Sequence, residues 1–458
     1  MTPARALKPH HDHMLIIKVK SSARDLTRSD AQERSPGLAA LRIAERDGLV
    51  RHIFHLRRRR GLKGARNVAS HVREAARDAA RGRRDGGALL IHLHDRVPLA
   101  ALRRSLARDP HVDYVALVPS RYVLASAPPR AIPFPLEREW NLRRIQWPEA
   151  RKLKRFRPAD GLRVAVLDSG VDVRHPSLQA SIGEYVYRHS DLPTTPSGHD
   201  LLGHGTHITG IIAAHSRSPF GVHGICRCRL TMHKVFVDHA AFDPVHDLFL
   251  YVVDPVLYRR ALADCVERDA DVINVSLGGP GEPDPYEDAL LQALLQRGAS
   301  IVAAMGNGRT IGSPTMYPAA VPGVIAVGAT DQNDVVAPFS SRGSHSALCA
   351  PGVGIWSTLP RYPGQFGFHA GRDIRGRRRA ASPLSRNVWY DAWPGTSMAT
   401  PHVTAAAALL RASRPGIAGP EVRERLMRTA DHVPGMGRMK FTPDYGSGRL
   451  NLRRLLAD

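Results

Sequence analysis

A serine, a histidine and an aspartate stand in three short segments whose residue types favour nucleophilic chemistry. Ser397 lies in PGTSMATPH, residues 394–402, at the start of an alanine-rich stretch that predicts a helix. A helix N-terminus presents unpaired backbone N–H groups and a partial positive charge, which would stabilise an oxyanion beside this serine. His204 lies in GHGTHITG, residues 203–210, and Asp168 ends the apolar run VAVLD, residues 164–168.

These three residue types supply what a serine nucleophile needs. A hydroxyl is a weak nucleophile until a base takes its proton, and an imidazole serves as that base when a carboxylate fixes its tautomer. The chain order is Asp168, His204, Ser397. This order and the long segment around Ser397 resemble the subtilisin-like serine proteases, the subtilase family. The resemblance implies a serine endopeptidase that hydrolyses peptide bonds through an acyl-enzyme intermediate.

The resemblance also implies residues that stabilise the oxyanion and bind the substrate. The family takes one oxyanion donor from an asparagine after a buried strand, and here the apolar run 300–305 leads into Asn307. Substrate is expected to bind as an added strand along residues 272–279. Met316 stands before Tyr317-Pro318, where the family often has a small residue, so we expect a shortened apolar pocket without a fixed charge. The residues implied for substrate binding are Ser276, Leu277, Gly278, Ala304, Gly306 and Met316.

Other interpretations of these segments are weaker. His204 and His207 could be metal ligands, but no third ligand cluster with zinc spacing is evident. An inactive subtilase-fold binding module would need a broken triad or oxyanion residue, and none is broken. The departures from the family pattern are Met305, the stretch 237–257 and an arginine-rich insertion near 361–393. Those changes flank the expected cleft and bear on specificity and access.

Length and charge indicate two domains. The chain has 458 residues, 43% of them hydrophobic, which is too long for one ordinary domain. Residues 1–130 carry 27 Lys/Arg and 12 Asp/Glu, net +15, so they hold most of the total net charge of +23. We expect an inhibitor-like prodomain at 1–126, a proline-rich linker at 127–139 and a subtilisin-like catalytic domain at 140–458.

The leading segment reads as a small α+β domain. Its periodicity predicts strands at 14–19, 88–93, 112–117 and 122–124, with helices at 65–81 and 99–108. The closing pattern, residues 102–115, resembles the end of a ferredoxin-like subtilase inhibitor prodomain. That resemblance implies an intramolecular inhibitor whose last strand, residues 122–125, blocks the cleft. Self-cleavage is expected between Leu124 and Arg130, in an exposed tether.

The catalytic segment reads as α/β. Largely apolar runs at 163–167, 232–237, 272–276, 301–304 and 324–327 predict a doubly wound, mostly parallel sheet with helices on both faces. Active-site residues then fall at the carboxyl ends of strands and at helix starts.

Composition also bears on cofactors, partners and compartment. No metal is expected: subtilases that bind calcium use an aspartate in His-Pro-Asp-Leu, whereas this chain has Ser177 at that position, and a hydroxyl is a poor calcium ligand. Nucleic acid is an unlikely partner, because the arginine runs at 57–60 and 372–379 lack interleaved aromatic residues. The four cysteines are expected to be buried, reduced thiols. No signal peptide or transmembrane segment is visible, which favours the cytoplasm unless the chain leaves by an unrecognised route.

Overall fold

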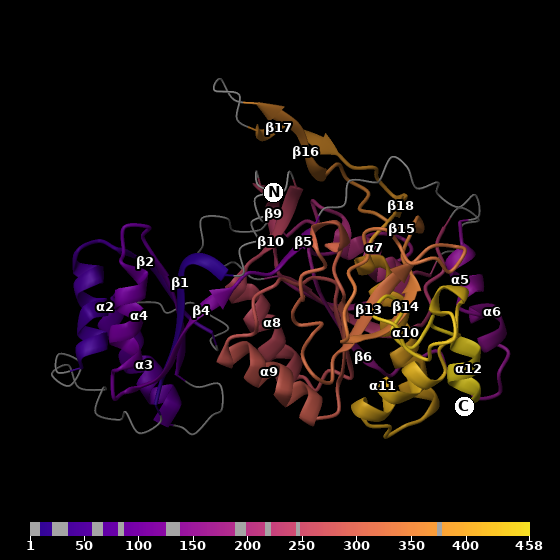
Figure 1. Ribbon diagram of the computed structural model, residues 1–458, viewed down its shortest axis with the longest axis horizontal. Helices are drawn as coiled ribbons and strands as arrows, with labels where there is room; N and C mark the ends of the chain where they lie inside the picture. The colour runs from indigo at the N-terminus through magenta and orange to yellow at the C-terminus, as the bar shows by residue number, and fades with distance from the viewer. Residues whose placement is uncertain are drawn as a thin grey trace.

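The structure is a computed structural model that describes residues 10–20, 35–56, 67–80, 87–124, 138–187, 198–215, 221–243, 248–372 and 378–458. A leading domain, residues 10–119, lies beside a large domain, residues 138–458, as Figure 1 shows. Residues 127–137 of the predicted linker, and the expected cleavage positions after Leu124, lie outside the described residues. Within the described part of the chain, no helix is long and apolar enough to cross a membrane.

The described part of the leading domain contains an antiparallel sheet and three helices. Its strands are β1 His10–Val19, β2 Val50–His55, β3 Ala88–Leu93 and β4 Val112–Pro119, in the order β2-β3-β1-β4. The helices are α2 Pro36–Arg46, α3 Val68–Ala80 and α4 Leu99–Ala107. A ferredoxin-like unit runs β-α-β-β-α-β, so α3 is an extra helix between the second and third strands. The sequence predicted α3 and α4 within a few residues but missed α2 and β2.

The two faces of this small sheet pack against different partners. Leu15 and Ile17 of β1 belong to a buried cluster with the helices of the leading domain. Met14 and Ile16, which point the other way, belong to a cluster that continues into the large domain. Alternation along a strand therefore makes one sheet both the core of the leading domain and its docking face.

The large domain is built on a seven-stranded sheet whose neighbouring strands are all parallel. The order is β14-β13-β12-β11-β6-β8-β7. The strands are β6 Arg163–Asp168, β7 Ile182–Val186, β8 Arg229–Lys234, β11 Val272–Val275, β12 Ser300–Ala304, β13 Ile325–Thr330 and β14 Ser346–Pro351. The predicted α/β class is confirmed.

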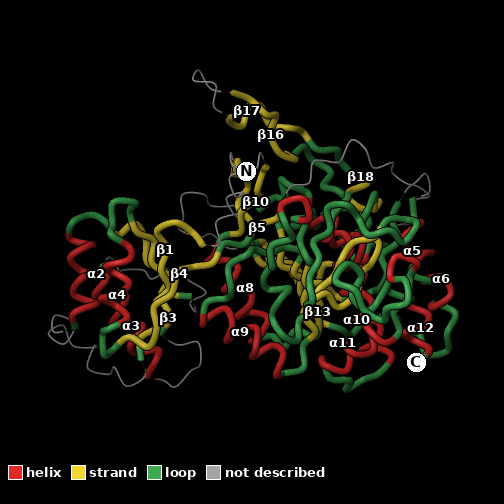
Figure 2. Tube along the Cα trace, viewed as in Figure 1, coloured by secondary structure: helices red, strands yellow, loops and turns green. Residues whose placement is uncertain are grey.

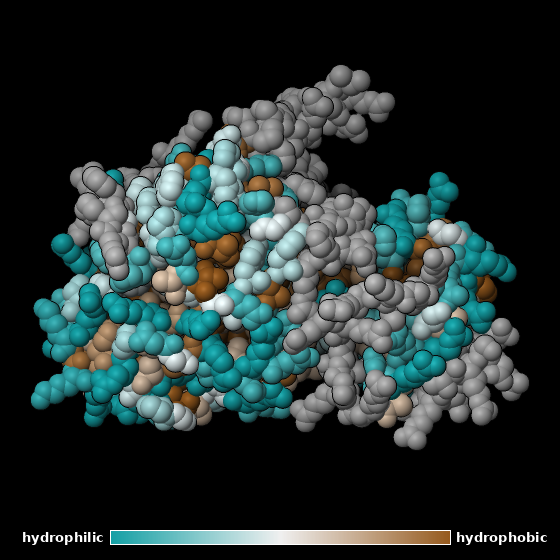
Figure 3. Space-filling view, turned by 180° about the vertical axis from the view of Figure 1, so that it is seen from behind, coloured by the Kyte–Doolittle hydropathy of each residue, from teal (hydrophilic) through white to brown (hydrophobic). Residues whose placement is uncertain are grey.

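Helices cover both faces of the large sheet. Val164 and Val166 of β6 pack in the cluster that contains α7 His204–Ala213, α10 Thr396–Ser413 and α11 Gly419–Arg428. Ala165 and Leu167 pack in the cluster of α8 Pro255–Glu267 and α9 Pro285–Gln296. Short helices complete the domain: α5 Trp140–Arg144, α6 Trp147–Ala150, α12 Leu452–Ala457 and the 3-10 turns η2 Arg309–Ile311 and η3 Pro434–Met436. Apolar side chains are mainly inside, and the face seen in Figure 3 is largely hydrophilic with scattered apolar residues.

One predicted strand is divided in the structure. The run 232–237 was expected to be continuous, but β8 ends at Lys234, and Phe236 begins β9, Phe236–Asp243, in a separate sheet. Val235 makes the last contact with the large sheet, since its N–H donates to the Asp168 carbonyl at 2.8 Å. The separate sheet has the order β5-β10-β9, with β5 Tyr122–Leu124 and β10 Leu248–Val253.

Two antiparallel strand pairs involve the predicted insertion, although the first strand of the first pair precedes residue 361. β15 Ile355–Thr358 pairs with β18 Tyr390–Trp393, and β16 Gln365–Arg372 pairs with β17 Arg378–Ser385. Figure 2 shows the β16–β17 hairpin standing off from the rest of the large domain. The four cysteines are all buried and form no disulfide.

Candidate active site

The three chemically suited residues lie where the large sheet meets its helices. Asp168 is the last residue of β6, His204 is the first residue of α7, and Ser397 is the second residue of α10. Gly205 lets α7 approach β6 closely, because a Cβ there would lie 2.1 Å from the Gly170 carbonyl oxygen. Gly395 precedes α10 with φ 153°, a conformation that other residues rarely adopt.

Asp168 and His204 are in direct contact. His204 Nδ1 lies 2.7 Å from Asp168 Oδ1, and the carboxylate is fully buried. The other nitrogen of the ring, Nε2, is buried and has no hydrogen-bond partner. Burial disfavours the imidazolium, but the Asp168 and Asp200 carboxylates together outweigh this effect and raise the pKa of His204 above its ordinary value. The carboxylate therefore fixes a tautomer in which Nε2 is the basic atom.

Ser397 is nearly buried and is held by Ser276. The Ser397 hydroxyl donates to the Ser276 carbonyl oxygen at 3.1 Å, and the Ser276 hydroxyl donates to the Ser397 carbonyl oxygen at 3.1 Å. The hydroxyl is thus not bonded to His204 Nε2 in this structure. Hydrogen bonds of this kind are often loose before substrate binds.

Asn307 stands beside Ser397. Its Oδ1 accepts hydrogen bonds from the Thr396 N–H at 3.0 Å and the Thr396 hydroxyl at 2.9 Å, which fixes the orientation of the side-chain amide. A Cβ built on Gly395 would lie 3.5 Å from Asn307 Nδ2 and 3.6 Å from the Ser397 nitrogen. Two hydrogen-bond donors therefore border the same small space, which glycine leaves open.

The residues implied for substrate binding are only partly brought together. Met316 is buried at 4% exposure and lies against glycines: a Cβ on Gly306 would meet its Cγ at 2.8 Å, and one on Gly278 would meet its Cβ at 3.6 Å. Ser276 contacts Ser397 directly. Ala304 is the buried last residue of β12. Leu277, by contrast, belongs to the core cluster of α8 and α9.

A strand of the same chain lies along this cleft. The Tyr122 N–H donates to the Gly278 carbonyl at 2.8 Å, and the Gly278 N–H donates to the Tyr122 carbonyl at 3.1 Å. On its other side, β5 pairs with β10, where Val123 lies opposite Tyr251. The Tyr122 side chain is buried with Met316. Figure 1 shows β5 leading from the leading domain into the large one.

Sequence reasoning missed Asp200, which holds the start of α7. Its carboxylate accepts from the Gly203 N–H at 2.9 Å, from the Thr206 N–H at 2.9 Å and from the Ser169 hydroxyl at 2.7 Å. An aspartate four residues before His204 was a capping signal that could have been recognised. His207, considered as a metal ligand, instead stacks on Trp393 with ring centroids 5.0 Å apart, and burial lowers its pKa to about 3.

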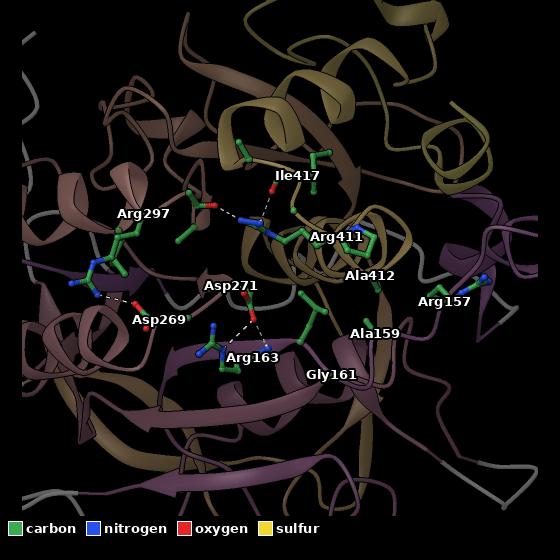
Figure 4. A pocket seen from close by; sticks show the side chains of 18 of the residues that line it. Arg157, Ala159, Gly161, Arg163, Asp269, Asp271, Arg297, Arg411, Ala412 and Ile417 are labelled. Carbon is green, nitrogen blue, oxygen red and sulfur yellow. Dashed lines mark hydrogen bonds and ion pairs between the residues drawn. The ribbon is translucent and has the colours of Figure 1, made fainter.

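A cavity of about 1090 Å³ lies elsewhere, at the amino ends of the central strands. Several of its charged groups are already engaged, as Figure 4 shows: Arg163 pairs with Asp271, Arg297 pairs with Asp269, and Arg411 donates to the Ile417 carbonyl. It contains none of the residues that the sequence suggested for chemistry. The cavity is therefore separate from the candidate active site.

Comparison with known proteins identifies the family. Residues 159–448 match the sequence profile of the subtilase family, Peptidase_S8. The chain is 31% identical over 368 residues to an alkaline protease of Shouchella clausii, covering 79% of this chain and 80% of that protein. It is 33% identical over 319 residues to subtilisin BL of Lederbergia lenta, covering 68% and 96%. The chain therefore belongs to the subtilase family, and it is a serine-type endopeptidase.

Solved structures agree on the fold. Fervidolysin from Fervidobacterium pennivorans, a keratinolytic enzyme related to subtilisin, matches with a TM-score of 0.64 and 21% identity, over 98% of this chain and 62% of that one. The prenylagaramide maturation protease PagA matches with a TM-score of 0.50 and 26% identity, over 68% of this chain and 97% of that one. The first match extends the fold likeness across nearly the whole chain.

Proposed function

We propose that Asp168, His204 and Ser397 form the catalytic triad of this protease. His204 Nε2 takes the Ser397 proton as Oγ attacks the peptide carbonyl carbon, and then gives that proton to the leaving amine. Asp168 stabilises the imidazolium that forms in between. A water molecule, activated by the same nitrogen, then hydrolyses the acyl-enzyme and restores the Ser397 hydroxyl. The 2.7 Å contact between Asp168 and His204, with Nε2 left free, carries this proposal.

The tetrahedral intermediate would place its oxyanion between Asn307 Nδ2 and the Ser397 N–H. Both donors border the space beside Gly395. Asn307 is oriented in advance by Thr396, so no reorganisation is needed when charge develops.

The leading domain acts as an intramolecular inhibitor in this proposal, and the enzyme removes it. In an antiparallel pair, two residues forward on one strand correspond to two residues back on the other. Tyr122 pairs with Gly278, so the same register continued by two residues would place Leu124 opposite Ser276, whose carbonyl contacts the Ser397 hydroxyl. The bond after Leu124 is therefore the expected self-cleavage site. Until that bond is cut and β5 leaves, the cleft is filled.

Mass spectrometry of purified protein tests the triad and the self-cleavage together. Wild type is expected to lose residues 1–124, whereas Ser397→Ala should stay intact and should not hydrolyse peptides. Ser413→Ala, at the opposite end of α10, is the matched control and should behave as wild type. A serine-directed phosphonate should block peptide hydrolysis. An unprocessed wild type that still hydrolyses peptides would refute self-cleavage alone, and activity in Ser397→Ala would refute the triad.

A further inference from the structure

Arg121, immediately before β5, is one of the most buried charged residues of the structure. Its side chain is 1% exposed. Nε and Nη2 donate to the two carboxylate oxygens of Glu287 at 3.1 and 2.9 Å, and Nη1 donates to the Gly281 carbonyl at 2.7 Å. A planar guanidinium matched to both oxygens of one carboxylate is the most directional ion pair that side chains make.

The pocket that receives Arg121 belongs to the large domain. Glu287 lies in the first turn of α9 and is fully buried. The neighbouring Asp284 caps the same helix, since it accepts from the Tyr286 and Glu287 N–H groups, and it also pairs with Arg259. Arg259 lies farther from Glu287, at 3.7 Å.

The charges of this pocket balance only when Arg121 is present. The large domain supplies two carboxylates, Asp284 and Glu287, and one guanidinium, Arg259. Once β5 leaves, one buried negative charge lacks a bidentate partner. Removing one partner of an ion pair leaves the charge of the other partner uncompensated. The vacated pocket therefore favours a cation, and the double contact with Glu287 favours arginine over lysine.

Arg121 occupies a position that a substrate residue would take. Its carbonyl accepts from the Val253 N–H at 3.0 Å, so its backbone continues the strand that pairs with β10 and Gly278. It stands three residues before Leu124, the residue at the proposed cleavage site. A substrate strand in the same register would direct its corresponding side chain toward Glu287, because side chains alternate with a fixed period along a strand.

We propose that Glu287 and the Gly281 carbonyl form an arginine-binding subsite, which selects peptides with arginine three residues before the residue whose carbonyl is attacked. The substrate class is thus a peptide of the type Arg-x-x-Leu, cut after the leucine. This subsite rests on the proposed function and on the register of β5. It assigns selectivity to a charged group in addition to the apolar Met316.

Peptides based on residues 118–128 test the subsite on the wild-type protein after self-processing has gone to completion. The position of Arg121 is varied among arginine, lysine, the neutral isostere citrulline and alanine. We expect kcat/KM to fall about tenfold to a hundredfold from arginine to citrulline or alanine, with lysine between them. Equal cleavage of all four peptides would overturn the subsite while leaving the proposed protease function intact. Cleavage of none would overturn both.

Two variants locate the selectivity at Glu287. Glu287→Gln should lose the preference for arginine over citrulline, measured as the ratio of the kcat/KM values for these two peptides. Asp288→Asn, the exposed next residue of α9, removes the same charge and should keep the wild-type preference. A preference that survives in Glu287→Gln would contradict the assignment. If Glu287→Gln does not fold, the four peptides on the unaltered protein decide the question alone.

Discussion

His204 and Ser397 both begin helices on the same sheet, but different surroundings hold them. Ser397 is supported from within the core by a buried chain of neutral hydrogen bonds that runs from Thr404 to Asn274, to Ser276 and to the Ser397 carbonyl. The loop before His204 is supported by the arginine-rich insertion. The serine side therefore depends on the buried core of the large domain, and the histidine side depends on the predicted arginine-rich insertion, residues 361–393.

Arg386 is the centre of the support on the histidine side. Its guanidinium is nearly buried and donates to backbone carbonyls of the loop and of the insertion, with no carboxylate among them. The acceptors are Leu201 at 3.0 Å, Asp200 at 3.3 Å, Tyr362 at 3.0 Å, Asn387 at 2.9 Å and Pro360 at 3.4 Å. A Cβ on Gly203 would meet Arg386 at 3.0 Å, so the arginine packs against the residue before His204.

The largest expected effect comes from Asp168→Asn, which removes the carboxylate that contacts His204 Nδ1. An amide cannot stabilise the imidazolium and favours the wrong tautomer, so kcat should fall by about 10⁴. Steady-state hydrolysis of the peptide based on residues 118–128, with arginine at the position of Arg121, measures this fall in kcat. Folding should be retained, because asparagine has the size of aspartate. A variant with kcat within tenfold of wild type would show that His204 needs no carboxylate.

The same variant has a predicted pH signature. In wild type, burial lowers the pKa of His204, but Asp168 and Asp200 raise it by more, so the net shift is upward. The base must be neutral, so activity falls as the pH drops through that pKa. Removing the Asp168 charge removes the larger of the two upward contributions, and the acid limb of the residual activity should move to lower pH. A limb that stays in place would mean that another group titrates.

Asn307→Ala probes the serine side with a smaller effect. Loss of one oxyanion donor typically costs about 10² to 10³ in kcat, with little change in KM. The backbone N–H of Ser397 remains as the second donor. Single-turnover acylation with an activated ester separates this effect from substrate binding. A rise in KM with unchanged kcat would place Asn307 in substrate binding and refute its role toward the oxyanion.

Arg386→Met asks whether the insertion holds the histidine side. The variant leaves carbonyls of the loop and insertion without a donor, and we expect a loss of roughly 3 to 5 kcal/mol in unfolding free energy. Urea unfolding in the Ser397→Ala background avoids self-digestion during the measurement. Arg155→Met, at an exposed arginine, is the control and should change little. Equal stability of the two variants would remove the insertion from this role.

Thr404→Val is the corresponding change on the serine side. It is nearly isosteric and deletes the hydroxyl that donates to Asn274 Oδ1 at 2.8 Å. One buried acceptor loses its partner, which costs about 1 to 3 kcal/mol. The same urea measurement applies. A loss larger than that of Arg386→Met would reverse the comparison between the two sides.

The sequence predicted features that depend on neighbouring residues, and it did not predict contacts between residues far apart in the chain. Asp168, His204, Ser397 and Asn307 could be named because each stands in a short local motif at the end of a strand or the start of a helix. The parallel strands were predictable from apolar runs. The exception is the run 232–237, which is divided at Val235 between β8 and β9, because an apolar run does not indicate which sheet its residues join. Nothing in the sequence pairs residues far apart, so Arg386 and its loop carbonyls went unrecognised.

The Arg121 contact was hidden for the same reason. Arg121 and Glu287 are 166 residues apart, and a single basic residue before a predicted strand has no distinguishing pattern. The helix α2 was missed although Pro36 stands at its start, because it follows a polar stretch. Residues that form a local motif can be recognised from one sequence, whereas an ion pair between residues far apart in the chain can be recognised only in the folded structure.

Metal removal should have the smallest effect. Ser177, at the position where an aspartate would have suggested calcium, has its hydroxyl 3.1 Å from the Tyr390 hydroxyl of β18. The nearby Asp172 carboxylate is paired with Arg361, which belongs to the insertion, at 2.8 Å. Among the described residues, no group of three or more His, Cys, Asp or Glu side chains could hold a metal ion. The Arg361 guanidinium thus already provides the positive charge beside the Asp172 carboxylate, where a metal cation would otherwise bind.

We therefore expect the thermal midpoint of the Ser397→Ala protein to be the same with and without a chelator, within the error of the measurement. Arg361→Met should lower that midpoint, because it leaves the Asp172 carboxylate, which is 4% exposed, without its counter-charge. A midpoint that falls on chelation and recovers with calcium would show a resident ion. In that case the histidine side would depend on a metal as well as on the insertion, and its contrast with the serine side would need a second cause.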